Sequence, residues 1–229
     1  MATSTTRPVP ATAARNLAAE GFEAHPVRGR FNSAFFAAMG GVINGHMHKH
    51  KARAFADLPA NVVELGSGVG ANLRYLPAGA RLIAIEPNPY MHARLRRAAR
   101  RRGVDVEIRS VAGERIDLPD ACAEAVISSL VLCTVSDPAG VLAEIRRILV
   151  PGGRFSFAEH VAATSGTPTR WLQRILRRPW AWVFEGCSCE RDLTALITSA
   201  GFASVDVTPY RIHSPFVPFN THIAGTAIA

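Results

Sequence analysis

The sequence predicts an open α/β fold with a seven-stranded, mostly parallel sheet, helices on both faces and a C-terminal antiparallel hairpin. From residue 61 onward, short apolar segments typical of strands alternate with helix-like segments, a pattern that gives parallel strands joined by right-handed crossovers. Near the end, segments 202–210 and 221–229 are both strand-like and have no helix between them. We therefore expect these two segments to pair antiparallel at the edge of the sheet.

The order of the elements follows from apolar runs and the residues that interrupt them. Strand-like runs occupy residues 61–66, 81–87, 104–110, 124–131 and 152–161, and helix-like segments between them occupy 71–76, 89–102 and 138–150. In the last of these helices, the apolar residues recur at helical spacing: Val141, Leu142, Ile145, Ile148 and Leu149. The Pro-Gly-Gly sequence at 151–153 then ends the helix and opens the next strand.

Length and composition predict one domain with a substantial core. The chain has 229 residues, 48% of them hydrophobic, and no apolar run approaches the ~18 residues that would span a bilayer. We expect a flexible leader followed by one domain. Its parts are a leader at 1–29 and a domain at 30–229, with N-terminal lid helices at 30–58, a cofactor-binding core at 60–160, a lid insertion at 163–192 and the hairpin at 202–229.

Charge and cysteine usage bear on partners and location. The net charge is +8, and arginines crowd segments 94–102 and 170–178, which we interpret as solvated basic faces rather than a nucleic-acid surface. No export signal or C-x-x-C pair accompanies the cysteines, so we expect reduced thiols and a cytoplasmic location. No metal site is predicted from the cysteines Cys122, Cys133, Cys187 and Cys189, nor from His46, His48 and His50, which a helix would spread around its axis.

A glycine loop follows the first strand. In "ELGSGVGAN", Gly66, Gly68 and Gly70 stand at alternate positions, where glycine permits a tight turn and lets a ligand touch the backbone. Glu86 ends the second strand, where a carboxylate can accept hydrogen bonds from ribose hydroxyls. This local motif leaves two kinds of cofactor open, a nicotinamide or flavin dinucleotide and S-adenosylmethionine.

Further motifs favour the second cofactor. "ELGSGVGAN" resembles motif I of the class I S-adenosylmethionine-dependent methyltransferases, whose fold is Rossmann-like, and "IEPNP" resembles their acidic motif after the second strand. "VAGERIDLPD" resembles the segment that frames the adenine, although Ala112 stands where that family commonly has Asp. Short-chain dehydrogenases need Tyr-x-x-x-Lys, and both lysines here precede the glycine loop.

The resemblance implies a set of residues that contact S-adenosylmethionine. An acidic residue near the glycine loop suits the ammonium group of this cofactor, and Glu86 suits its ribose. The predicted cofactor-binding residues are Glu64, Gly66, Ser67, Gly68, Gly70, Asn72, Glu86, Pro87, Gly113, Glu114 and Ser129.

Three other segments narrow the resemblance. "SSLVLCTV", "FAEHVAA" and "PWAWVFEGCSCERD" resemble the methyltransferase-like subgroup, within the methyltransferase type 11 family, that includes thiol S-methyltransferases. The resemblance implies methyl transfer to a small molecule, with a thiol as the first candidate acceptor. The alternatives are O-, N- or C-methylation of a lipid, quinone or secondary metabolite, and less favoured are a nicotinamide-dependent oxidoreductase and a non-catalytic cofactor-binding protein.

Candidate catalytic residues end the fifth strand. His160 lies where the methyl group should emerge, and a histidine is well suited to accept a proton from a thiol, so we predict it as a base or orienting residue with Glu159 in reserve. The basic insertion that follows holds all three tryptophans, Trp171, Trp180 and Trp182. We favour a substrate lid for it over peripheral membrane contact. The oligomeric state is left open.

Overall fold

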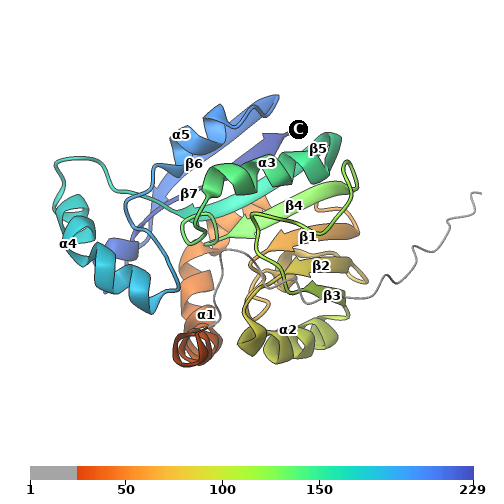
Figure 1. The fold of residues 1–229 in the computed structure, drawn as a ribbon, viewed down its shortest axis with the longest axis horizontal. Helices are drawn as coiled ribbons and strands as arrows, with labels where there is room; N and C mark the ends of the chain where they lie inside the picture. Colours follow the sequence, from red (N-terminus) through yellow and green to blue (C-terminus); the bar gives the residue numbers. More distant parts are fainter. Residues whose placement is uncertain (1–24) are drawn as a thin grey trace, which may run out of the picture.

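The computed structural model describes residues 25–229 and confirms the predicted architecture. One seven-stranded sheet has the order β3-β2-β1-β4-β5-β7-β6. Strands β1 to β5 run parallel to one another, and β7 pairs antiparallel with both β5 and β6 (Figure 1). Their bounds are β1 Asn61–Leu65, β2 Arg81–Ile85, β3 Asp105–Arg109, β4 Ala123–Ser129, β5 Leu149–His160, β6 Ser204–Arg211 and β7 Thr221–Ile228.

Helices cover both faces of this sheet and form a core on each side. On one face, α1 (Pro26–Ala54) and α2 (Pro89–Arg102) bury Met47 and Leu95 against the strands, and Phe55, which directly follows α1, is buried beside them. On the other face, α3 (Pro138–Ile148) and α5 (Leu193–Ser199) pack against Phe155 and Phe157 of β5. Helix α4 (Pro168–Val183), cyan in Figure 1, stands beyond the carboxyl ends of the parallel strands.

Three elements differ from the predictions. The N-terminal region is one helix that already begins at Pro26, where His25 accepts a hydrogen bond from the Arg28 N–H and proline suits the first helical turn. The predicted helix at 71–76 is only a 3₁₀ turn, η1 (Leu73–Tyr75), because Gly70 has φ of +88° and Pro77 follows immediately. Helix α5 had no counterpart in the predictions.

The remaining observations concern the predicted leader, the connection between the hairpin strands and the length of the helices. Of the predicted leader at 1–29, residues 1–24 lie outside the described residues, and 26–29 belong to α1. A second 3₁₀ turn, η2 (Val217–Phe219), lies between the hairpin strands. Among the helices of residues 25–229, none combines the length and apolar character needed to cross a membrane.

We predict that the hairpin tolerates no side chain at Gly225. A Cβ atom there would collide with the carbonyl oxygen of Asp206 on β6 and lie 3.0 Å from the Phe157 ring. Gly225→Ala should lower the free energy of unfolding by about 1–3 kcal/mol in urea denaturation, because the strands must separate to accommodate it. As a control, Gly45→Ala in α1, which meets no atom within 4 Å, should be neutral or slightly stabilising. Equal stability of the two variants would contradict the predicted close packing of β7.

Candidate functional site

A cavity of about 590 Å³ opens at the carboxyl edge of the sheet. It lies where the strand order reverses, between β1 and β4, the position at which open α/β sheets bind ligands. The loops after β1 and β2 line one part of it. Residues 112–114 after β3, the loop after β4, helix α1, the end of α4 and residues of segment 212–219 also line it.

The glycines of the predicted loop have two different roles. Gly66 and Gly68 lie on the cavity wall with φ of +58° and +55°, and a side chain at Gly66 would collide with Val131. Gly70 does not line this cavity. A Cβ atom there would lie 2.7 Å from Leu73 and 3.2 Å from Leu95, so Gly70 is needed for packing of the loop against α2. Gly70 thus has a structural role, and its cofactor contact stays a prediction.

Glu86 joins the glycine loop to the start of α2. Its carboxylate is buried on the cavity wall, where Oε2 accepts a hydrogen bond from the Gly68 N–H (2.7 Å) and Oε1 from the Asn88 N–H (2.9 Å). Burial raises the pKa of this carboxyl to about 7, and the neighbouring carboxylates of Glu185 and Glu64 add to the rise. Hydrogen bonds from hydroxyl groups of a ligand would stabilise the ionised form of this carboxylate.

A buried polar chain, which the sequence did not predict, runs behind the glycine loop. The Lys51 ammonium donates to Asn44 Oδ1 and Asn72 Oδ1, both at 2.9 Å, and Asn72 Nδ2 donates to Glu64 Oε1 at 2.7 Å. Burial lowers the pKa of Lys51 to about 8 and raises the pKa of Glu64. Lys51 and Asn72 reach the cavity wall, whereas Glu64 lies beneath it with Oε2 lacking a partner.

The remaining predicted contacts all lie on the wall of the cavity. Glu114 accepts hydrogen bonds from the N–H and hydroxyl of Ser136, which fixes the loop before α3. The hydroxyl oxygens of Ser67 and Ser129 are buried there without a partner. Pro87 and Gly113 complete the predicted set. Together, unpartnered hydroxyls, a lysine and a carboxylate at the end of β2 fit the amino-acid end and ribose of S-adenosylmethionine.

Aromatic side chains form the other part of the wall. Phe35 of α1 packs edge-on against Phe184, just after α4, with ring centroids 5.5 Å apart, and Trp180 packs on Phe184 at 4.6 Å. Asn32 of α1 donates to the carbonyl of Val183 at 2.9 Å. These contacts join α1 to the end of α4, so the two predicted lid segments together cover an apolar part of the cavity.

Only one of the three tryptophans in the insertion faces the cavity. Trp180 lines it, whereas Trp171 and Trp182 are 65% and 62% exposed. A lid role for Trp180 agrees with this arrangement. Peripheral membrane contact through the exposed pair stays a prediction.

The predicted catalytic pair lies one layer behind the cavity wall. The Glu159 carboxylate is fully buried and accepts hydrogen bonds from Ser128 Oγ (2.6 Å) and the Val131 N–H (2.9 Å), so it anchors the loop after β4. His160 is fully buried as well, and its Nε2 lies 2.8 Å from the carbonyl oxygen of Pro218. A general base must lie within hydrogen-bond reach of its proton. His160 does not itself line the cavity; it meets the wall through Cys187, whose Sγ lies 3.5 Å from its Nδ1, and through the nearby rings of Phe219 and Trp180.

The histidines of α1 point in different directions, as the helix predicts. His46 reaches the cavity wall, His48 stacks on Tyr75, and His50 stacks on Tyr210 with ring centroids 3.8 Å apart. The residues that the structure does bring together are Cys133, His160 and Cys187, from three distant segments. No spacing in the sequence indicates this cluster, because its members meet only through the tertiary fold.

We predict that cofactor binding releases a proton from Glu86. Ribose hydroxyls stabilise the carboxylate, so the pKa of about 7 falls in the complex, and affinity should rise as pH increases towards 7. Calorimetry in buffers of different ionisation enthalpy should detect this proton near pH 6. Glu86→Gln should abolish the release and weaken binding by about 1–3 kcal/mol.

The control for this experiment is an exposed acidic residue. Glu107 on β3 pairs with Arg81 and Arg109 at the surface, and Glu107→Gln should bind and release protons as the parent does. Proton release that persists in Glu86→Gln would assign the ionisation to another group.

Comparisons with known proteins agree with this site. A family model described as "Methyltransferase domain" matches residues 63–157. Thiol S-methyltransferase TMT1B of Rattus norvegicus is 34% identical over 170 residues, covering 73% of this chain and 70% of the relative. Thiol S-methyltransferase TMT1A of Homo sapiens is 31% identical over 198 residues, covering 82% and 81%.

A solved structure shows the same fold at low identity. It is a SAM-dependent methyltransferase of Thermotoga maritima, described as a possible histamine N-methyltransferase, with a TM-score of 0.63 and 19% identity over 88% of this chain and 97% of that one. Since the cavity, the glycine loop, Glu86 and the family model coincide in one place, the methyl donor is S-adenosylmethionine. The chain belongs to the S-adenosylmethionine-dependent methyltransferases, in the family that includes the thiol S-methyltransferases TMT1A and TMT1B.

Proposed function

We propose that this protein transfers a methyl group from S-adenosylmethionine to the sulfur of a small apolar thiol. The observation that carries the proposal is the aromatic part of the cavity, built by Phe35, Phe36, Trp180, Phe184 and Phe219 beside the cofactor-binding loops. Such a wall removes an apolar substituent from water but offers few partners to a polar acceptor. The printed names of two relatives, both thiol S-methyltransferases, point to the same acceptor.

Different residues on the cavity wall bind different parts of the cofactor and the acceptor. Glu86 accepts from the ribose hydroxyls, while Lys51 and the unpartnered hydroxyls of Ser67 and Ser129 serve polar groups of the cofactor. When bound, the cofactor supplies an electrophilic methyl group on a sulfonium. The aromatic wall and the lid hold the acceptor sulfur in line with that methyl group and exclude water, and alignment of this kind accounts for most of the acceleration.

A matched set of acceptors tests the proposal. Benzyl mercaptan, benzyl alcohol and benzylamine share one apolar skeleton and differ in the atom that would receive the methyl group. With the purified chain and S-adenosylmethionine, mass spectrometry should find the methyl thioether as the main product, and the rate should rise with pH as more thiolate forms. Methylation of the amine or alcohol with the thiol left unchanged would overturn the proposal.

We predict that Trp180 and Trp182 have separable effects on this reaction. Trp180→Ala removes apolar surface from the wall and should raise KM for the thiol by about 10- to 100-fold, equivalent to roughly 1.5–3 kcal/mol of lost burial. Trp182→Ala is the matched control, since its ring is exposed and does not line the cavity. Cofactor affinity should stay unchanged in both variants. Equal KM values for the two would contradict a lid role for Trp180.

A further inference from the structure

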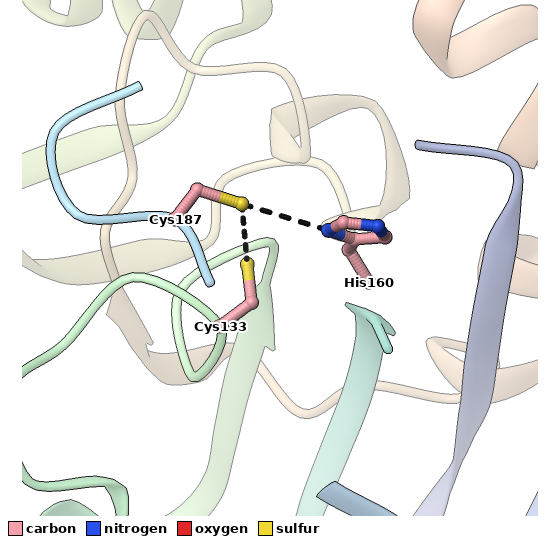
Figure 2. Close-up of side chains that lie close together, drawn as sticks. All are labelled: Cys133, His160 and Cys187. Carbon is pink, nitrogen blue, oxygen red and sulfur yellow. Dashed lines mark hydrogen bonds between the residues drawn. The ribbon is translucent and has the colours of Figure 1, made fainter. Parts of the chain in front are cut away.

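Three side chains of types that bind metals converge at the cavity wall. Cys133 follows β4, His160 ends β5, and Cys187 follows α4 (Figure 2). The two sulfur atoms lie 3.6 Å apart, and Cys187 Sγ lies 3.5 Å from His160 Nδ1. All three side chains are buried, and their donor atoms lie within 4.8 Å of one another.

The separations of Cys187 Sγ from Cys133 Sγ and from His160 Nδ1 match those of a tetrahedral zinc site. Bonds of about 2.3 Å to sulfur and about 2.0 Å to nitrogen, at tetrahedral angles, place two sulfur ligands about 3.8 Å apart and a sulfur and a nitrogen about 3.5 Å apart. A disulfide, by contrast, would require the sulfurs to approach to about 2.05 Å. Two cysteines and one histidine are also a ligand set that occurs in zinc sites of proteins.

The hydrogen bonds of His160 leave the correct nitrogen free for a metal. The carbonyl oxygen of Pro218 can only accept, so Nε2 carries the proton and the lone pair of Nδ1 points to the sulfur of Cys187. Metal-bound histidines usually donate their other ring N–H to a carbonyl or carboxylate in this way. Gln173 Nε2 donates to the same carbonyl at 2.9 Å and helps fix its position.

The backbone holds the two cysteines in place. The Ser188 N–H donates to the carbonyl of Cys133 at 2.7 Å, which ties the segment after α4 to the loop after β4. Gly186 permits this approach, because it has φ of +101° and a side chain there would lie 2.8 Å from the carbonyl oxygen of Thr134. Glu159 anchors the same loop through the Val131 N–H. The cluster is therefore held by contacts outside the three side chains.

The cluster opens towards the acceptor part of the cavity. Cys133 and Cys187 line the wall, whereas His160 lies behind it. Arg191 also lines the wall, and its guanidinium donates to the carbonyl of Leu132, the residue before Cys133. Three protein ligands leave one coordination position of a tetrahedral ion for water or substrate.

We propose that Cys133, His160 and Cys187 bind a zinc ion whose open position faces the cavity and takes the acceptor thiol as a thiolate. The thiol loses its proton to solvent when its sulfur binds the ion. A lone pair of that sulfur then forms the bond to the methyl carbon while the bond from this carbon to the donor sulfonium breaks, and the neutral thioether leaves the ion. The thiol-binding part rests on the proposed function, whereas the zinc site itself does not.

Metal analysis of the full chain, purified without a histidine tag or chelator, tests the site. Elemental analysis should find one equivalent of zinc in the parent, and Cys187→Ser and His160→Ala should lose it. Cys189→Ser is the matched control, since Cys189 is also buried but contacts the carbonyl of Gln173 instead of the cluster. This control should retain the metal. Retention in all variants, or a disulfide between Cys133 and Cys187 in the parent, would overturn the proposal.

Cobalt in place of zinc keeps the test independent of how well the variants fold. The cobalt form of the parent should show the charge-transfer and intense d–d absorption of a tetrahedral thiolate site, and adding a small alkyl thiol should shift the d–d bands. A parent that binds no cobalt overturns the site. If adding an alkyl thiol leaves the d–d bands of the cobalt form unchanged, the thiol-binding role is overturned even if thiol methylation is observed. If methylation fails but the thiol shift is seen, the proposed function fails and the site stands.

Discussion

A carboxylate buried at the end of a strand must find hydrogen-bond donors inside the protein, and this constraint shapes the whole carboxyl edge of the sheet. Glu64 of β1, Glu86 after β2 and Glu159 of β5 are all buried, and burial raises the pKa of each. Their donors come from Asn72, from the backbone at Gly68 and Asn88, and from Ser128 and Val131. Satisfying the carboxylates therefore fixes the loops that carry the site.

The fixed loops surround one cavity with two kinds of wall. Polar groups gather where the order of strands reverses, and aromatic side chains gather where α1 meets the end of α4. The first wall suits a charged nucleoside cofactor, and the second suits an apolar substituent of the acceptor. The polar wall depends on the strand ends, and the aromatic wall depends on the contacts between α1 and the end of α4.

The sequence predicts the parts of this arrangement that depend on local pattern. Apolar runs identified the strands of the parallel core, and the glycine loop with Glu86 identified the cofactor side, because turns and strand ends are encoded by neighbouring residues. Lys51 was missed because nothing near it in sequence shows that it is buried beside Asn72. His160 was predicted as a base from its place at a strand end; its side chain is buried, hydrogen-bonds to the carbonyl of Pro218 and does not line the cavity, and its role in catalysis stays a prediction. The cluster of Cys133, His160 and Cys187 was not predicted, because its members are distant in the sequence and meet only in the folded chain.

A crystal structure of the chain with S-adenosylhomocysteine and a small alkyl thiol tests the central claim most directly, because it places donor, acceptor and wall residues in one experiment. The account predicts the ribose hydroxyls on the Glu86 carboxylate and the alkyl group against Trp180 and Phe184. It also predicts that the acceptor sulfur points towards Cys133 and Cys187. A cofactor bound elsewhere, or a thiol on the opposite side of the glycine loop, would contradict it.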